Sequence, residues 1–221
     1  MSRGCYTVLG SLPHLPHFER AERLPLTRLR LEQRIGMLPD DESRQIWEAE
    51  ALVSLRHAVS RRPDDDGWLR RWRRAMPVIR QPALQEYVRF RLDQQVALAA
   101  LRLRHAGLGP ETEPDIWTVS PYGRHIRAHW QSPDFHLAAR HPWLPAVREA
   151  LAREDAVAME RHLLESCWRW LARRAAAEPL GFAAVVAFVF QWDIVNAWLS
   201  RDPRRAAVCF ERLLQESRHA R

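Results

Sequence analysis

Prolines and glycines divide this sequence into segments of helix length, and that spacing constrains the fold more than any other feature. Few stretches between them show the period-two alternation of apolar and polar residues that a sheet requires. Inside the segments, apolar residues recur at helical spacing instead. We therefore predict an all-α protein, a single helical domain over residues 1–221 with roughly eight helices in one compact array.

Start and stop signals place the individual helices. Pro25 suits the first position of one helix, Gly36 its end, and Asp40 and Asp155 the caps of two others. One segment is an exception, because residues 6–10 are β-capable and precede a turn with proline, so we expect a short extended segment there. The predicted helices cover residues 25–35, 40–62, 68–76, 82–107, 143–153, 155–177 and 180–199, with a final helix after Asp202 and Pro203.

The segment at residues 180–199 is the most hydrophobic and has the length of a membrane span. It contains Gln191, Asp193 and Asn196, and an aspartate near the centre of a span costs about 2.5–3.5 kcal/mol on insertion scales. We therefore expect a buried core helix rather than a membrane helix.

The absence of lysine removes two classes of chemistry. All 34 basic residues are arginine, so neither a phosphate-binding loop of the Walker type nor a Schiff base is available. No G-x-G-x-x-G run is present, which argues against a nucleotide fold. The three cysteines form no C-x-x-C pair, and residues 1–7 lack the apolar core of a secretory signal, so we expect a reducing, cytoplasmic location.

Histidines near the middle of the chain have a spacing that suits metal ligands. His125 and His129 stand at i, i+4 spacing, with Asp134, His136 and His141 close behind. Structural histidines that pack on a core are commoner than ligands, so we predict no metal and no cofactor, and keep the pair as weak candidates. No nucleophile is coupled to a base by a recognisable motif, and we predict that the protein is not an enzyme.

Arginines alternate with Trp68 and Trp72 in the segment before Pro77. The mixture is typical of proteins that grip phosphates and stack bases, and the net charge of +7 favours an anionic partner. The same pattern describes an amphipathic helix with tryptophans inward and arginines outward, which would dock on an acidic protein surface. The candidate partner-binding residues are Arg70, Arg71, Arg73, Arg74, Arg102 and Arg104.

Two of the predicted buried helices share a short pattern at an offset of 100 residues. Residues 90–98 and 190–198 match in an aromatic residue, an aspartate, an alanine and two large apolar residues. The match indicates two helical units, 1–107 and 143–221, joined by a proline-rich connection at 108–142, with chance similarity as the alternative. Asp93 and Asp193, with Asn196, are predicted structural polar anchors, and the alternative for the two aspartates is a buried catalytic pair.

At these residues the sequence resembles the C-type (also called d-type) central-stalk subunits of V-type and archaeal-type rotary ATPases, and more closely the short bacterial relatives found with them. The resemblance covers the helices around Asp93 and Asp193, the run 101–104, the opening residues 6–13, and residues 192–198 followed by Phe210. Full family members carry three helical units, whereas this chain has room for about two.

The resemblance implies a non-catalytic coupling component, a helical socket that lies on the membrane rotor ring and receives the central stalk. Its partners would be other ATPase subunits, with no small-molecule substrate, and it would be cytoplasmic or peripheral at the inner face of the membrane. The alternatives are a basic nucleic-acid-binding or adaptor protein and a small helical metalloenzyme.

Overall fold

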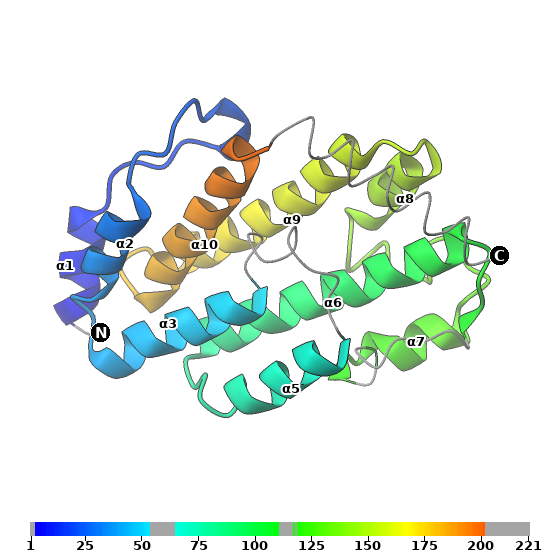
Figure 1. Cartoon of the computed structure of the whole chain (residues 1–221), viewed down its shortest axis with the longest axis horizontal. Coiled ribbons are helices and arrows are strands. Elements are labelled where there is room, and N and C mark those ends of the chain that lie inside the picture. The colour runs from blue at the N-terminus through cyan, green and yellow to red at the C-terminus, as the bar shows by residue number, and fades with distance from the viewer. Residues whose placement is uncertain (1–2, 54–64, 111–116, 118, 202–221) are drawn as a thin grey trace.

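The all-α prediction is confirmed in a computed structural model that describes residues 3–53, 65–110, 117 and 119–201 (Figure 1). Within these residues the chain forms nine α-helices and one 3-10 turn, and no strand. The helices are α1 (Arg3–Ser11), α2 (Arg28–Ile35), α3 (Asp40–Val53), α5 (Asp65–Ala75), α6 (Pro82–His105), α7 (Tyr122–Ala128), α8 (Leu144–Ala152), α9 (Ala156–Ala177) and α10 (Phe182–Leu199), and the turn is η1 (Phe18–Arg20).

Local signals explain where most of these helices begin. The Asp155 side chain accepts a hydrogen bond from the Ala158 amide at 2.8 Å, which is the predicted cap of α9. Thr27 caps α2, so this helix starts later than the predicted Pro25. Asp40 is the first residue of α3 rather than its cap. The helix predicted after Asp202 lies outside the described residues.

The prediction of an extended segment at residues 6–10 is wrong, because these residues belong to α1. Cys5 and Val8 are buried, and Leu9 and Leu12 pack against the same hydrophobic cluster. These four positions are spaced as one face of a helix. Burial of that face on α10 outweighs the β-preference of the individual residues, since tertiary packing overrides intrinsic propensity.

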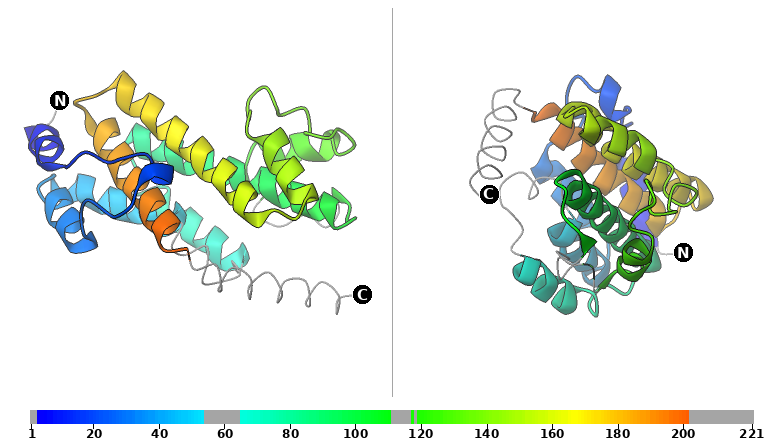
Figure 2. Two further views of the ribbon diagram at one scale, coloured as in Figure 1. Left: turned by 90° about the horizontal axis from the view of Figure 1, so that it is seen from above. Right: turned by 90° about the vertical axis from the view of Figure 1, so that its right-hand side faces the viewer.

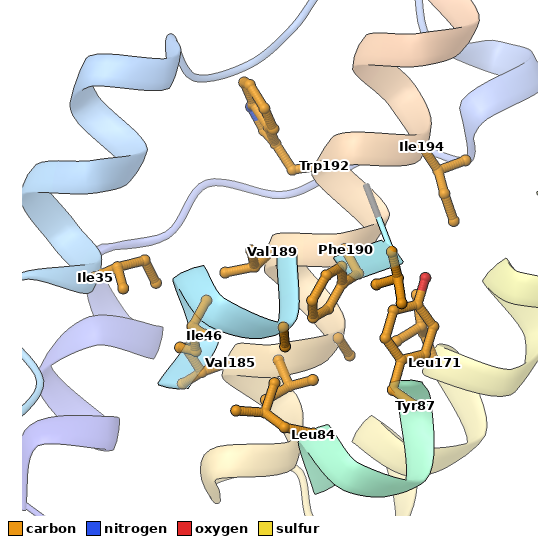
Figure 3. Packing of buried hydrophobic residues seen from close by; sticks show 14 of the residues in the cluster. Ile35, Ile46, Leu84, Tyr87, Leu171, Val185, Val189, Phe190, Trp192 and Ile194 are labelled. Atoms are coloured by element: carbon orange, nitrogen blue, oxygen red, sulfur yellow. The ribbon is translucent and has the colours of Figure 1, made fainter. Parts of the chain in front are cut away.

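Two long helices, α6 and α9, run through the length of the molecule and connect two hydrophobic clusters (Figures 1 and 2). The larger cluster lies where α1, α2, α3 and α10 pack on the first half of α6 and the second half of α9. Figure 3 shows its centre, where Tyr87 of α6, Leu171 of α9 and Phe190 of α10 meet. The smaller cluster lies at the opposite end, around α7 and α8.

The segment 108–142 contributes to the core as well as connecting the proposed units. It contains α7, and its residues Trp117, Ile126, Trp130, Phe135 and Leu137 are buried in the smaller cluster. They pack on Leu92, Val96, Ala97, Ala100 and Leu101 of α6. The second half of α6 is therefore covered by this segment, which explains why α6 is apolar on most sides along its whole length.

Helix α10 is long and apolar enough to cross a membrane by length and composition alone. In the structure most of it is buried among protein elements, and it packs on α1, η1, α6 and α9. The Nε1–H of Trp192 donates to the Leu26 carbonyl at 2.8 Å, which ties the helix to the segment before α2. This environment is that of a core helix in a helical protein.

Candidate functional site

The predicted arginine row of α5 lies on the surface. Arg70, Arg71, Arg73 and Arg74 are exposed, whereas Leu69 and Ala75 on the opposite side of the helix are buried. Within the described part of the chain, Arg71, Arg73 and Arg74 have no ion-pair partner, and Arg70 has an interaction of its own. We call these four residues the α5 arginine row. It is a local concentration of positive charge that the fold leaves available to solvent.

Trp72 does not share this exposure. Its side chain is half-buried and packs against both hydrophobic clusters, so it anchors α5 to the body of the protein. The side chain of Trp68 lies outside the described part of the structure. The expected division of the helix, with tryptophan inward and arginine outward, therefore describes Trp72 and the arginine row.

The other two candidate partner-binding arginines differ from each other. Arg102 is exposed on the last turns of α6. Arg104 is used inside the molecule, because its guanidinium donates to the carbonyl oxygens of Trp130, Ser132 and Pro133 and lies 4.6 Å from the ring centroid of Phe135. We therefore assign Arg104 to the support of this loop rather than to docking.

A buried polar network joins α6 and α9, and sequence patterns did not reveal it. Arg91 of α6 donates to Gln94 Oε1 and, at 3.0 Å, to the Sγ of Cys167 on α9. The amide of Gln94 in turn donates to the hydroxyl of Ser166 at 2.6 Å and to the Leu163 carbonyl at 3.1 Å. Arg91, Gln94 and Cys167 are all buried, so this network holds the two long helices in one register.

Asp193 belongs to the same buried region and is only 2% exposed. Burial works against the charge of Arg91, but Cys167, Tyr87 and Asp193 nearby favour it and raise the pKa of the guanidinium. The pKa of Tyr87 is raised by burial in the same place. The buried Asp193 thus adds negative charge near Arg91, and its role as a polar anchor stays a prediction.

Asp93 has a different environment from Asp193. Its half-buried carboxylate accepts a hydrogen bond from Ser120 Oγ at 2.8 Å, and that hydroxyl also accepts from the Tyr122 amide at the start of α7. Burial raises the pKa of Asp93, while the Ser120 hydrogen bond and Arg89 act in the opposite direction. The two aspartates therefore lie in different environments, which gives no support to a shared catalytic pair.

Asn196 is half-buried on the last turn of α10, where its backbone carbonyl accepts from the Ser200 amide at 3.0 Å. This is the hydrogen bond that ends the helix. A half-buried position at a helix end fits the structural role predicted for this residue.

The histidines of the middle segment lie in a row. The ring centroids of His125 and His129 are 4.4 Å apart, and those of His129 and His136 are 4.6 Å apart. The Nε2–H of His125 donates to the Phe135 carbonyl at 2.9 Å. Among the described residues, no group of three or more histidine, cysteine, aspartate or glutamate side chains is arranged to hold a metal ion. The i, i+4 spacing of His125 and His129 thus brings their rings together on one side of α7, with His136 beside His129.

These features define an all-α protein with an exposed arginine row on one helix and polar side chains buried between its long helices. A family described as "Protein of unknown function (DUF2764)" matches residues 74–220, about two thirds of the chain, and the protein belongs to that family. The matched part begins at the end of α5 and includes both long helices. No curated protein and no solved structure matches the chain.

Proposed function

We propose that this protein is a non-catalytic assembly and coupling component that resembles the C-type central-stalk subunit of a V-type proton- or sodium-translocating ATPase. It would dock the rotor stalk to the membrane ring. The observation that carries a docking role is the α5 arginine row, which is exposed on one side of a helix whose other side is anchored by Trp72. Arginine is favoured at protein interfaces because its planar fork binds carboxylates in two places at once.

The assignment to a rotary ATPase rests on the sequence resemblance at the helices around Asp93 and Asp193, which are α6 and α10. The half-buried Asp93 accepts a hydrogen bond from Ser120 and Asp193 is buried, which suits structural anchors of a helical socket. The partners would be rotor-stalk and membrane-ring subunits, and the location cytoplasmic or peripheral at the inner face of the membrane. No cofactor or small-molecule substrate is part of this proposal.

The position of Trp72 favours a protein partner over a polynucleotide. Sequence-independent binding of single strands combines cationic side chains with aromatic faces on which bases stack. Trp72 packs against the hydrophobic clusters, so it is engaged inside the protein rather than presented beside the arginines. The α5 arginine row supplies the charge for phosphate binding without that stacking surface, and an acidic protein surface needs charge alone.

The experiment is an affinity pull-down of the full-length protein from native membranes and cytosol at moderate salt, followed by mass spectrometry. We expect V-type ATPase stalk or ring subunits with the wild type and their loss with Arg71→Glu, Arg73→Glu and Arg74→Glu combined. The matched control reverses Arg20, Arg23 and Arg30, three exposed arginines before and within α2. This control changes the net charge equally and is expected to keep the partners.

Two results would overturn the proposal. One is the recovery of salt-sensitive nucleic acid without ATPase subunits, which would favour the polynucleotide alternative. The other is equal recovery of ATPase subunits by the α5 variant and the control, which would move docking away from the arginine row.

A further inference from the structure

The histidine row at the end of α7 is the feature that the proposed function leaves unused. His125 lies within α7, His129 is its C-cap residue, and His136 comes from the loop that follows. His125 and His129 are half-buried and His136 is exposed, so the row lies at the protein surface. Neighbouring rings in the row are tilted against each other, at interplanar angles of 53° and 37°.

The loop that carries His136 is held in an unusual backbone conformation. Phe135 and His136 both have positive φ angles, 53° and 57°. This conformation is costly for residues other than glycine and persists only where surrounding contacts determine it. The contacts are present, because Asp134 Oδ1 accepts from Ser132 Oγ at 3.0 Å and from the His136 amide at 3.1 Å, and Phe135 is fully buried.

The backbone turn at Phe135 and His136 places these two side chains in opposite environments. Phe135 enters the smaller cluster and packs near Trp130, while its carbonyl accepts from His125. His136 is turned to the surface, beside His129. The packing that fixes Phe135 therefore also fixes the position of the third imidazole in the row.

The charges around the row are almost all positive. Between Tyr122 and Trp143 the sequence has three arginines and four histidines against a single acid, Asp134. Arg124 and Arg127 are exposed on α7, and Arg104 of α6 reaches the loop, with Arg148 of α8 adding to its field. The fourth histidine, His141, is buried beside Tyr122.

These neighbours decide how the row responds to acid. The pKa of His129 is lowered, first by desolvation and then by His125 and His136. The pKa of Asp134 is lowered chiefly by its hydrogen bond to Ser132, with a smaller effect of His136, so this carboxylate stays ionised as the pH falls. Positive charge that the row gains on protonation thus meets a single acidic neighbour among the described residues, Asp134, and additional negative charge from a partner would favour it.

We propose that the histidine row is a second docking site, which binds an acidic segment of a partner protein and binds it more tightly as the pH falls. Carboxylates of the partner would accept hydrogen bonds from the protonated rings of His129 and His136, while Arg124 beside them attracts the segment at any pH. Proton uptake by the row and binding of the partner are thermodynamically linked. Protonation of the row strengthens binding by a certain free energy, and binding favours protonation by the same free energy. This site is separate from the α5 arginine row and requires no ATPase subunit.

The test measures binding of a fluorescent peptide of alternating glutamate and serine to the full-length protein at about pH 7.5 and about pH 5.5. The glutamates remain mostly ionised at both values, since their unperturbed pKa is about 4.3. The test variant is His129→Gln with His136→Gln, which leaves the His125 and Asp134 hydrogen bonds intact. The control is His14→Gln with His105→Gln, because both of these histidines are exposed outside the row.

We expect the wild type and the control to bind at least about fivefold more tightly at the lower pH, and the test variant to lose most of this gain. Circular dichroism at both pH values checks that the variants remain folded. NMR titration of the imidazole C–H signals should show higher pKa values for His129 and His136 when the peptide is bound. An equal pH dependence in the test variant and the control would overturn the proposal, as would unchanged histidine titration with peptide bound.

Discussion

The guanidinium of Arg28 forms a two-point ion pair with the buried carboxylate of Glu50, and this pair fastens α2 to α3. The Nη2···Oε2 distance is 2.8 Å and Nη1 contacts Oε1. The Nε of Arg28 donates to Glu32 on its own helix, and the guanidinium lies 4.6 Å from the ring centroid of Trp47. The hydrogen bond to Glu50, with a smaller contribution from Glu32, raises the pKa of Arg28, so its guanidinium stays protonated.

We predict that Arg28→Ala destabilises the protein by about 2 kcal/mol, because it removes the two-point contact between the guanidinium and the buried Glu50 carboxylate. The Glu50 side chain is 8% exposed, whereas Arg28 is 29% exposed and only partly screened from water. Urea denaturation provides the measurement. Arg30→Ala is the control, since Arg30 is exposed on the same helix and should change stability by less than about 0.5 kcal/mol. Similar losses for the two variants would show that the ion pair contributes little.

The Arg91 network should matter more than any surface ion pair. Arg91→Ala would remove the stronger of the two donors to Gln94 Oε1, leaving the Cys167 thiol at 3.4 Å, and would remove the positive charge near Asp193. We predict a loss of about 3–5 kcal/mol in the free energy of unfolding, as for other buried charges that lose a partner. Cys167→Ala, which removes a weak sulfur acceptor of Arg91 and a weak thiol donor to Gln94, should cost less. If denaturation gave the reverse order, the thiol rather than the guanidinium would be the important member.

Gly123 is a position where any side chain would collide with the backbone. A Cβ atom there would lie 2.4 Å from the carbonyl oxygen of Trp117, and the carbonyl belongs to a residue that is itself 1% exposed. We predict that Gly123→Ala destabilises the protein by about 1–3 kcal/mol through overpacking. Gly10→Ala is the control because its Cβ would meet nothing within 4 Å. Equal thermal unfolding temperatures for the two variants would contradict this prediction.

The helices were predictable from the sequence because their signals are local. Proline and glycine end them, Asp155 caps one, and periodic apolar residues mark the buried faces. The prediction of an extended segment at residues 6–10 was wrong for a physical reason. The β-preference of these residues stabilises less than the burial of Cys5 and Val8 against a helix that is distant in the sequence. Nothing in a short window reports that α10 will cover them.

The candidate site residues also divide into those that a local pattern predicts and those that depend on contacts distant in the sequence. Exposure of the α5 arginine row followed from the pattern around Trp72, which is a property of one helix. The Arg91–Cys167 contact joins residues 76 positions apart, and the use of Arg104 by a loop depends on where that loop returns. Such contacts are set by tertiary packing, so one sequence without its structure cannot place them. His136 lies beside His129 because Phe135 and His136 have positive φ angles, and no local sequence motif predicts that conformation.

His141 gives the protein a stability that depends on pH, with a sign that follows from its environment. The ring is buried between Tyr122 and Trp143, and burial, followed by Arg140, lowers its pKa. The unfolded chain therefore takes up this proton more readily than the folded protein, because an unfolded histidine titrates near about pH 6.5. Stability from this group is fully present above that value and is lost as the pH falls below it.

We predict that His141→Phe removes part of this acid sensitivity. Phenylalanine keeps an aromatic ring against Tyr122 and has no proton to take up, and the buried Nε2 of His141 has no hydrogen-bond partner to lose. Urea denaturation at about pH 7.5 and about pH 5.5 should show a smaller fall in unfolding free energy for the variant than for the wild type. His14→Gln controls for an exposed histidine and should retain the wild-type fall. If the variant lost as much stability in acid as the wild type, the acid sensitivity would come from groups other than His141. The histidine row would then be the first candidate, because the lowered pKa of His129 also makes the folded protein less stable as the pH falls.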